Sequence, residues 1–151
     1  GLWRQLNGAD AATVRARNVT RPALRFATSW DTRLSVAAGA AAGVAFMHHH
    51  GIVHRDLTSS NLVLDLAKGG GAAWVAKVCD FNLSREIPAA SVSHMLAHSG
   101  KTYSPLWSSP ELLRGDPYGT PSDVYSFGVI LYELLTLTLP YADTGPSEIE
   151  Q

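Results

Sequence analysis

Residues 52–64 have the sequence Ile52-Val53-His54-Arg55-Asp56-Leu57-Thr58-Ser59-Ser60-Asn61-Leu62-Val63-Leu64, and the rest of the chain is interpreted around them. Apolar residues flank a polar turn on both sides. Asp56 inside the turn is followed five positions later by Asn61. This pattern predicts a turn between two buried elements, with both polar side chains carried by the same turn.

A helix is expected just before this turn. Asp31 suits the N-cap position at its start, and an apolar stripe follows at spacings of three and four residues. The Ala and Gly content of the helix allows a neighbouring helix to pack close. Gly51 follows the last periodic residue and suits the left-handed position that ends many helices. The expected stripe consists of Leu34, Ala38, Ala41, Ala45 and His48.

A β-hairpin is expected just after the turn. Leu62–Leu64 and Trp74–Val78 are short apolar runs with β-branched residues, and the glycine-rich segment 68–71 lies between them. Asp56 and Asn61 come just before the first strand, and Asp80 follows the second. The hairpin therefore predicts that these three polar side chains lie at one edge.

The second half of the chain contains a loop and another helix. Segment 84–103 is polar and rich in Ser and His, which predicts a mobile loop. Pro110 begins a short helix. Ser122 is the expected N-cap of a longer helix at 123–137. That helix is apolar nearly all round, although it contains Glu133, so we expect it to be buried in the core.

The composition indicates a globular chain of one domain or less. It has 151 residues, of which 46% are hydrophobic and 17% are charged. The formal net charge of −1 gives no electrostatic case for nucleic acid as a partner. The longest apolar runs, 35–47 and 127–139, are too short for a membrane span of ~20 residues. A single cysteine, Cys79, excludes an intramolecular disulfide and fits a reducing compartment.

The run His48-His49-His50, together with His54, allows a zinc interpretation. Consecutive histidines on a helix point in different directions, however, and no cysteine lies near the run. The favoured interpretation is a helix end, where cationic side chains interact well with the helix dipole.

Four motifs follow one another along the chain: residues 52–64, Cys79-Asp80-Phe81-Asn82, Ser109-Pro110-Glu111 and Asp123-Val124-Tyr125-Ser126-Phe127-Gly128. In this order they resemble the catalytic half of a eukaryotic protein kinase, whose pattern is H-R-D-x-x-x-x-N followed by D-F-G. The last motif is most similar to the tyrosine-kinase-like group, most of whose members modify Ser or Thr.

The resemblance implies a mainly helical fold with a small β-hairpin, which is the C-terminal lobe of a protein kinase. It covers nearly all of residues 1–151 and implies a partial domain, incomplete at both ends and without the N-terminal lobe. Within it, the catalytic loop is 52–64, the activation segment is 80–111 and the buried helix is 123–137.

The resemblance also implies a protein kinase that uses ATP and Mg²⁺ on a protein substrate. Asp56 matches the catalytic base, which orients the substrate hydroxyl and accepts its proton. Asn61 and Asp80 match the metal ligands, and hard oxygen ligands suit Mg²⁺. Val63 matches the apolar floor below the adenine. Arg55 matches the residue that meets a phosphate on the activation segment. Candidate phosphate acceptors are Ser91, Ser93, Ser99, Thr102 and Tyr103.

Further positions carry over by motif. His54 and Phe81 resemble two residues of the apolar spine that stacks when the site is assembled. Asp123 resembles the helix-start Asp that accepts hydrogen bonds from the backbone of the His-Arg-Asp turn. Glu111 resembles a Glu that pairs with an Arg near the end of the domain. The chain has no such Arg, so Glu111 is expected to lack its partner.

Two positions depart from the family pattern. Thr58 occupies the catalytic-loop position where Ser/Thr kinases usually carry Lys, and Thr cannot supply the positive charge. Asn82 stands in place of the Gly of D-F-G. Because Asn is the next most tolerant residue of left-handed backbone, the turn can survive while the movement of Phe81 is stiffened.

These observations leave three functional hypotheses open. The first is an ATP-dependent kinase, with Ser/Thr specificity favoured over Tyr. The second is a pseudokinase or scaffold, for which Thr58 and Asn82 are the signs of relaxed constraint. The third is an inactive truncated remnant. The expected location is the cytoplasm, or the cytosolic side of a larger protein.

Overall fold

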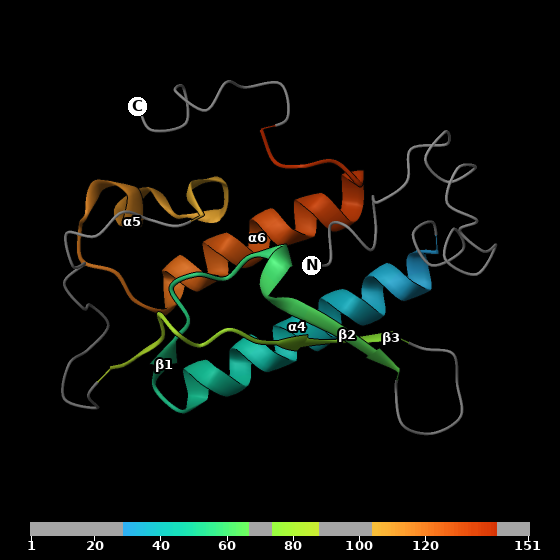
Figure 1. Cartoon of the computed structure of the whole chain (residues 1–151), viewed down its shortest axis with the longest axis horizontal. Coiled ribbons are helices and arrows are strands. Elements are labelled where there is room, and N and C mark those ends of the chain that lie inside the picture. The colour runs from blue at the N-terminus through green and yellow to red at the C-terminus, as the bar shows by residue number, and fades with distance from the viewer. Residues whose placement is uncertain (1–28, 67–73, 88–103, 142–151) are drawn as a thin grey trace.

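The computed structural model describes residues 29–66, 74–87 and 104–141. In Figure 1, the two long helices α4 and α6 run side by side, and the hairpin of β2 and β3 lies against α4. The described part is mostly helical, as expected. Its elements in chain order are α4 (Trp30–His49), β1 (Ile52–Val53), η1 (Ser59–Asn61), β2 (Leu62–Leu66), β3 (Trp74–Val78), β4 (Arg85–Glu86), η2 (Pro105–Trp107), α5 (Pro110–Arg114) and α6 (Thr120–Thr136).

Helix α4 begins and ends close to the expected positions. Its N-cap is Ser29 and not Asp31, which lies in the first turn, where a carboxylate still interacts favourably with the helix dipole. At the other end, Gly51 has a φ of 70°, so the predicted left-handed residue after the helix is confirmed. The chain therefore turns sharply into β1 and residues 52–64.

The predicted buried stripe of α4 is wrong. The buried residues are Val36, Ala40, Val44 and Met47, whereas Leu34 is 62% exposed. The helix is rich in small apolar residues on every side, so spacing alone cannot identify the face that packs. The neighbouring elements decide the buried face.

The glycines of α4 allow close packing, but of a strand and not of a helix. A Cβ atom at Gly39 would lie 2.8 Å from the backbone N and O of Ala76, and one at Gly43 would lie 2.8 Å from Val78 Cγ2. Since real Cβ atoms do not approach so closely, a larger residue would push β3 away from α4. This packing fixes the position of the hairpin, and with it the strand end that precedes Asp80.

Two short antiparallel pairings surround the polar turn. β2 pairs with β3 from Leu62 opposite Val78 to Leu66 opposite Trp74, so the predicted hairpin is confirmed. Its loop, including residues 68–71, lies outside the described residues. β1 pairs with β4 through Val53 opposite Arg85. The prediction of a loop from residue 84 is therefore wrong at the start of the segment, while 88–103 lies outside the described residues.

Helix α6 differs from the predicted buried helix in its start and in its burial. It begins at Thr120, with Gly119 as N-cap, so Ser122 is inside the helix. Val124 and Leu135 are each 57% exposed. The buried face instead carries polar residues among apolar ones. Its members are Ser122, Asp123, Ser126, Ile130, Glu133 and Leu134.

The core lies where α4, α6 and the hairpin meet. Its buried apolar side chains come from all of these elements and from the polar turn itself, through Leu57. Leu57 thus anchors the turn to the core. Within the described ranges, no helix is long and apolar enough to cross a membrane. The core residues are Val36, Ala40, Val44, Leu57, Leu62, Ala76, Ile130 and Leu134.

Candidate active site

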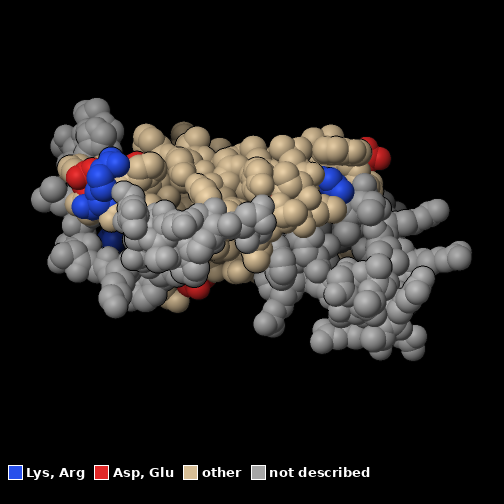
Figure 2. Space-filling model, turned by 90° about the horizontal axis from the view of Figure 1, so that it is seen from above, with Lys and Arg blue, Asp and Glu red and all other residues tan. Residues whose placement is uncertain are grey.

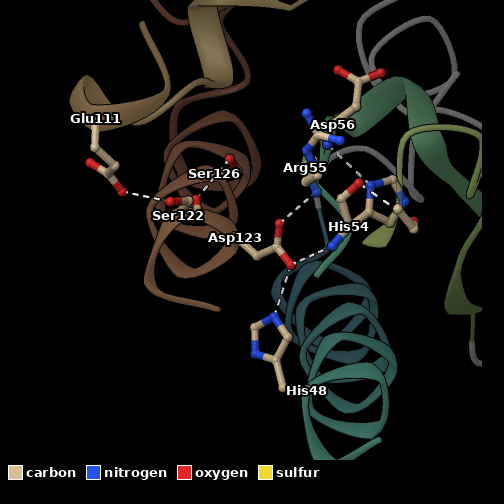
Figure 3. A network of polar contacts seen from close by, with 9 residues as sticks. His48, His54, Arg55, Asp56, Glu111, Ser122, Asp123 and Ser126 are labelled. Carbon is tan, nitrogen blue, oxygen red and sulfur yellow. Dashed lines mark hydrogen bonds and ion pairs between the residues drawn. The ribbon is translucent and has the colours of Figure 1, made fainter. Parts of the chain in front are cut away.

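The polar turn is held from below by Asp123 of α6 (Figure 3). Asp123 Oδ2 accepts a hydrogen bond from the backbone N–H of His54 at 2.8 Å, and Oδ1 accepts one from that of Arg55 at 2.9 Å. The carboxylate is 1% exposed. Arg55 has a φ of 71°, which is unfavourable for a residue with a side chain. The two hydrogen bonds stabilise this backbone conformation, and the role expected of Asp123 is confirmed.

His48, in the last turn of α4, shares the same carboxylate. Its Nε2 lies 2.8 Å from Asp123 Oδ2. His50 Nδ1 lies 2.8 Å from the backbone oxygen of Phe46. Each of these rings thus has a structural partner within the fold. The part of the chain that the structure describes contains no group of three His, Cys, Asp or Glu that could hold a metal ion.

His54 joins the turn to the end of β3. Its Nε2 lies 3.0 Å from the backbone oxygen of Cys79, and its Nδ1 lies 3.4 Å from the backbone nitrogen of Asp56. One tautomer satisfies both contacts, because Nε2–H then donates to Cys79 and Nδ1 accepts from Asp56. The ring centroid lies 5.6 Å from that of Phe81. His54 and Phe81 are therefore in contact, as the motif predicted.

Asp56 and Asn61 also lie together, as their spacing predicted. Asn61 Nδ2 donates to the backbone oxygen of Asp56 at 2.8 Å and approaches its Oδ2 at 3.3 Å. The backbone N–H of Cys79 donates to the backbone oxygen of Asn61 at 2.9 Å. The residue after Cys79 is Asp80, so the hairpin brings all three predicted polar residues to one edge.

Asp80 is exposed at this edge and has a φ of 65°. Its carboxylate forms none of the hydrogen bonds or ion pairs found among the described residues. The carboxylate of Asp80 and the amide oxygen of Asn61 are chemically suited to Mg²⁺, which uses few protein ligands and completes its shell with water and phosphate oxygens. Asn61 Nδ2 is already engaged as a donor, so its Oδ1 is the atom suited to a metal. The residues therefore fit the implied ion.

Cys79 is a structural neighbour of this edge. Burial, followed by the charge of Asp80, raises the pKa of its thiol. The Sγ atom lies 3.2 Å from the backbone oxygen of Asn61, to which it can donate. A raised pKa disfavours the reactive thiolate. Cys79 therefore acts as a small packed residue with a weak hydrogen bond.

Thr58 and Val63 were also predicted to lie in the site. Thr58 is buried, and its Oγ1 accepts a hydrogen bond from the N–H of Ser60 at 3.2 Å. It is the N-cap of η1, which explains why a short hydroxyl residue fits here. Val63 is 52% exposed on β2 and presents apolar surface close to the polar edge.

The side chain of Arg55 lies beneath the segment that follows Asp80. Its Nη1 donates to the backbone oxygen of Leu83 at 3.2 Å, and its guanidinium lies 4.9 Å from the centroid of Tyr118. Its Nε is buried and has no hydrogen-bond partner among the described residues. A buried unpaired donor is unfavourable. The guanidinium thus retains capacity for a further acceptor.

Glu111, which was expected to lack its Arg partner, has a different partner in the described part of the chain. Ser122 Oγ donates to its Oε1 at 2.6 Å, which ties α5 to the start of α6 (Figure 3). Burial acts to raise the pKa of Glu111, but hydrogen bonds, led by that of Ser122, and the charge of Arg114 outweigh it, so the pKa is lowered.

Sequence reasoning did not assign a role to Glu133. Its Oε1 accepts a hydrogen bond from Ser59 Oγ at 3.0 Å, and its Oε2 accepts one from Trp107 Nε1 at 2.7 Å. Burial raises the pKa of its carboxyl, and these two hydrogen bonds oppose that rise. The available signal was a single acidic residue within an otherwise apolar run, because a buried charge needs partners.

One face of the described part carries few charged side chains. Figure 2 shows a face that is mostly uncharged, on which Lys and Arg form no continuous basic patch among the coloured residues.

The strained turn carries Asp56 and Asn61, and Asp80 follows the neighbouring strand β3. The sequence model of the protein kinase domain matches residues 18–151, and this chain belongs to the protein kinase family. The predicted resemblance, including that to the tyrosine-kinase-like Ser/Thr group, is confirmed.

The chain is similar to kinases of two named specificities. It is 42% identical over 119 residues to Serine/threonine-protein kinase CTR1 of Arabidopsis thaliana, a match that covers 78% of the chain and 13% of the relative. It is 43% identical over 107 residues to Dual specificity testis-specific protein kinase 2 of Rattus norvegicus, covering 70% of the chain and 18% of the relative. The chain thus spans less than a fifth of the length of these relatives.

Proposed function

We propose that this chain is the catalytic-loop half of an ATP-dependent protein kinase, part of its C-terminal lobe, that transfers the γ-phosphoryl group to a hydroxyl of a protein substrate. One observation carries the proposal. Asp56 and Asn61 contact each other, and the hydrogen bond between Cys79 N–H and the Asn61 oxygen puts Asp80 at the same edge. Family membership supports the same conclusion.

Each residue has a proposed task. Asp56 orients the attacking hydroxyl and accepts its proton, while Asn61 and Asp80 supply the oxygen ligands of Mg²⁺. When bound, the Mg²⁺–ATP complex supplies the transferable phosphoryl group and neutralises its charge. Val63 contributes apolar surface for the adenine. The buried Nε of Arg55 has no hydrogen-bond partner among the described residues, so we propose that it binds an additional acceptor, for which a phosphate on the activation segment 80–111 is suited.

The proposed acceptor is Ser or Thr in preference to Tyr. The relatives include kinases named for Ser/Thr and for dual specificity, so phosphoamino-acid analysis of the product is needed. Thr58 does not provide the positive charge usual at its position, because its side chain is neutral, and its hydroxyl caps η1 inside the fold. In the proposed reaction, the negative charge of the transferred phosphoryl group is therefore not neutralised by a lysine at position 58.

The test is magnesium-dependent transfer of labelled phosphate from ATP to a generic protein substrate by the full-length protein. Asp56→Asn keeps the shape of the side chain but cannot accept the proton, so we expect transfer to fall by about 10²-fold or more. Asp65→Asn, at an exposed position on β2, is the matched control and should leave transfer unchanged.

The alternative is a pseudokinase that acts as a scaffold. Thr58 favours it, because this neutral residue, buried and engaged in capping η1, contributes no positive charge to a transferred phosphate. The two functions give different results in the same assay. A folded full-length protein with no transfer and no ATP-dependent thermal shift supports the scaffold and contradicts the kinase.

A further inference from the structure

Glu133 is a buried acidic group that the proposed chemistry does not use. It lies in the last third of α6 and is 2% exposed. A carboxylate in such surroundings is costly unless both of its oxygens receive hydrogen bonds. Its two donors come from segments far apart in the sequence: Ser59 belongs to the catalytic loop, and Trp107 belongs to η2. One side chain therefore joins two segments that share no element.

The two donors, Ser59 and Trp107, are each held in place by other contacts besides Glu133. Ser59 is flanked by Thr58 and Ser60, which form the cap of η1 directly before Asn61. Trp107 is fixed to α6 at a second point, because Ser126 Oγ donates to its backbone oxygen at 2.7 Å. The backbone of Trp107 is thus held by Ser126, and the hydrogen bond to Glu133 fixes the orientation of its indole ring. Ser59 and the indole bond different oxygens of the same carboxylate, so a rotation of that carboxylate moves both acceptors together.

We propose that Glu133 is a positioning residue that couples the catalytic loop to η2, so that residues 59–61 and residues 105–107 are set in place together. This inference rests on the proposed kinase function, since it assigns to Glu133 the alignment of the loop that carries Asn61. Both carboxylate oxygens of Glu133 accept hydrogen bonds from within the fold. It acts through Ser59 on one side and through Trp107 on the other.

The coupling is tested by hydrogen exchange in the full-length protein, which needs no catalytic activity. The variant Trp107→Phe removes the indole donor and keeps an aromatic ring. We expect faster exchange of the amides of 104–109 and also of 57–62, although no hydrogen bond joins Trp107 to the catalytic loop directly. In a Glu133→Gln background the same substitution should no longer affect 57–62. Glu86→Gln, the same change at an exposed glutamate of β4, should alter neither segment.

Kinetics test the positioning role. Ser59→Ala and Trp107→Phe should each lower kcat by about tenfold, while KM for ATP changes by less than about twofold. The double variant should lose less than the product of the two single effects, because both act through one carboxylate. Multiplicative effects on kcat overturn the coupling.

The outcomes separate this inference from the proposed function. If Trp107→Phe quickens exchange in both segments, the coupling through Glu133 is supported, even when the protein transfers no phosphate. The lack of phosphate transfer would then contradict only the proposed kinase function. Exchange that quickens in 104–109 alone overturns the linkage, even in an active kinase. Ser59→Ala retains Glu133 and Trp107, so it provides the same test from the opposite side if Glu133→Gln does not fold.

Discussion

Two buried carboxylates of α6 hold the same loop in different ways. Asp123, near the start of the helix, accepts hydrogen bonds from the backbone of His54 and Arg55. Glu133, near its end, accepts hydrogen bonds from the side chains of Ser59 and Trp107. Asp123 therefore fixes a backbone conformation whatever side chains the turn carries. Glu133 depends on which side chains are present.

The difference explains which contact the sequence could predict. Every residue except proline offers a backbone N–H, so a motif that positions Asp123 is sufficient to predict its partners. The partners of Glu133 must be a hydroxyl and an indole at particular points, and Trp107 is in a different segment of the chain. The comparison predicts that loss of Asp123 affects the fold most, and loss of Glu133 affects the relation between two segments.

The largest effect is expected for Asp123→Ala. It leaves two backbone donors without an acceptor beneath a strained residue, and breaks the contact with His48. We expect a loss of about 3–5 kcal/mol in the free energy of unfolding, measured by urea denaturation. Asp65→Ala, which breaks an exposed ion pair with Lys77, is the control and should cost about 0–1 kcal/mol. Equal losses in the two variants contradict the role of Asp123.

A smaller effect is expected for Glu133→Gln. The amide keeps one accepting oxygen but presents an NH₂ group to the second donor, so one buried hydrogen bond is lost. We expect a loss of about 1–3 kcal/mol by the same measurement. If Glu133→Gln lowers the free energy of unfolding more than Asp123→Ala does, the side-chain partners of Glu133 stabilise the fold more than the backbone partners of Asp123. That result would contradict the proposed ranking of the two carboxylates.

Thr58 lies in the loop between the residues held by Asp123 and the residue held by Glu133. Variants at Thr58 measure how much its hydroxyl stabilises the turn. Thr58→Val removes the hydroxyl that caps η1 and keeps the volume, with an expected cost of about 1 kcal/mol. Thr58→Ser retains the hydroxyl and should cost clearly less. Thermal denaturation of both variants measures the difference. If valine and serine behave alike, the hydrogen bond from the N–H of Ser60 does not stabilise the loop.

The pH dependence of stability should have opposite signs at two glutamates. The lowered pKa of Glu111 contributes stability above the pKa of the unfolded chain, and this is lost as pH falls through the folded-state pKa. The raised pKa of Glu133 has the reverse effect, because its contribution is present at low pH and is lost as pH rises.

Paired variants separate the two effects. Ser122→Ala, which removes the main hydrogen bond to Glu111, should flatten the acid side of a stability–pH curve measured by urea denaturation. Glu133→Gln should instead reduce the decline of stability with rising pH. Curves that shift in the same direction for both variants contradict these assignments.

Sequence reasoning predicted what depends on backbone and short spacing. Gly51, the β2–β3 hairpin and the meeting of Asp56 with Asn61 all follow from local pattern. The packing face of α4 could not be predicted, because its small apolar residues present no distinct stripe. The pairing of β4 with β1 and the contact between Ser122 and Glu111 depend on tertiary structure, and no local pattern indicates either.

The proposed function requires that residues 52–64 and Asp80 form a metal–nucleotide site. Calorimetric titration of the full-length protein with ATP, with and without Mg²⁺, tests it most directly. We predict binding that requires Mg²⁺ and that Asp80→Asn weakens by about tenfold or more, because the amide replaces a charged ligand. Absence of binding, or binding that neither Mg²⁺ removal nor Asp80→Asn affects, would contradict the claim.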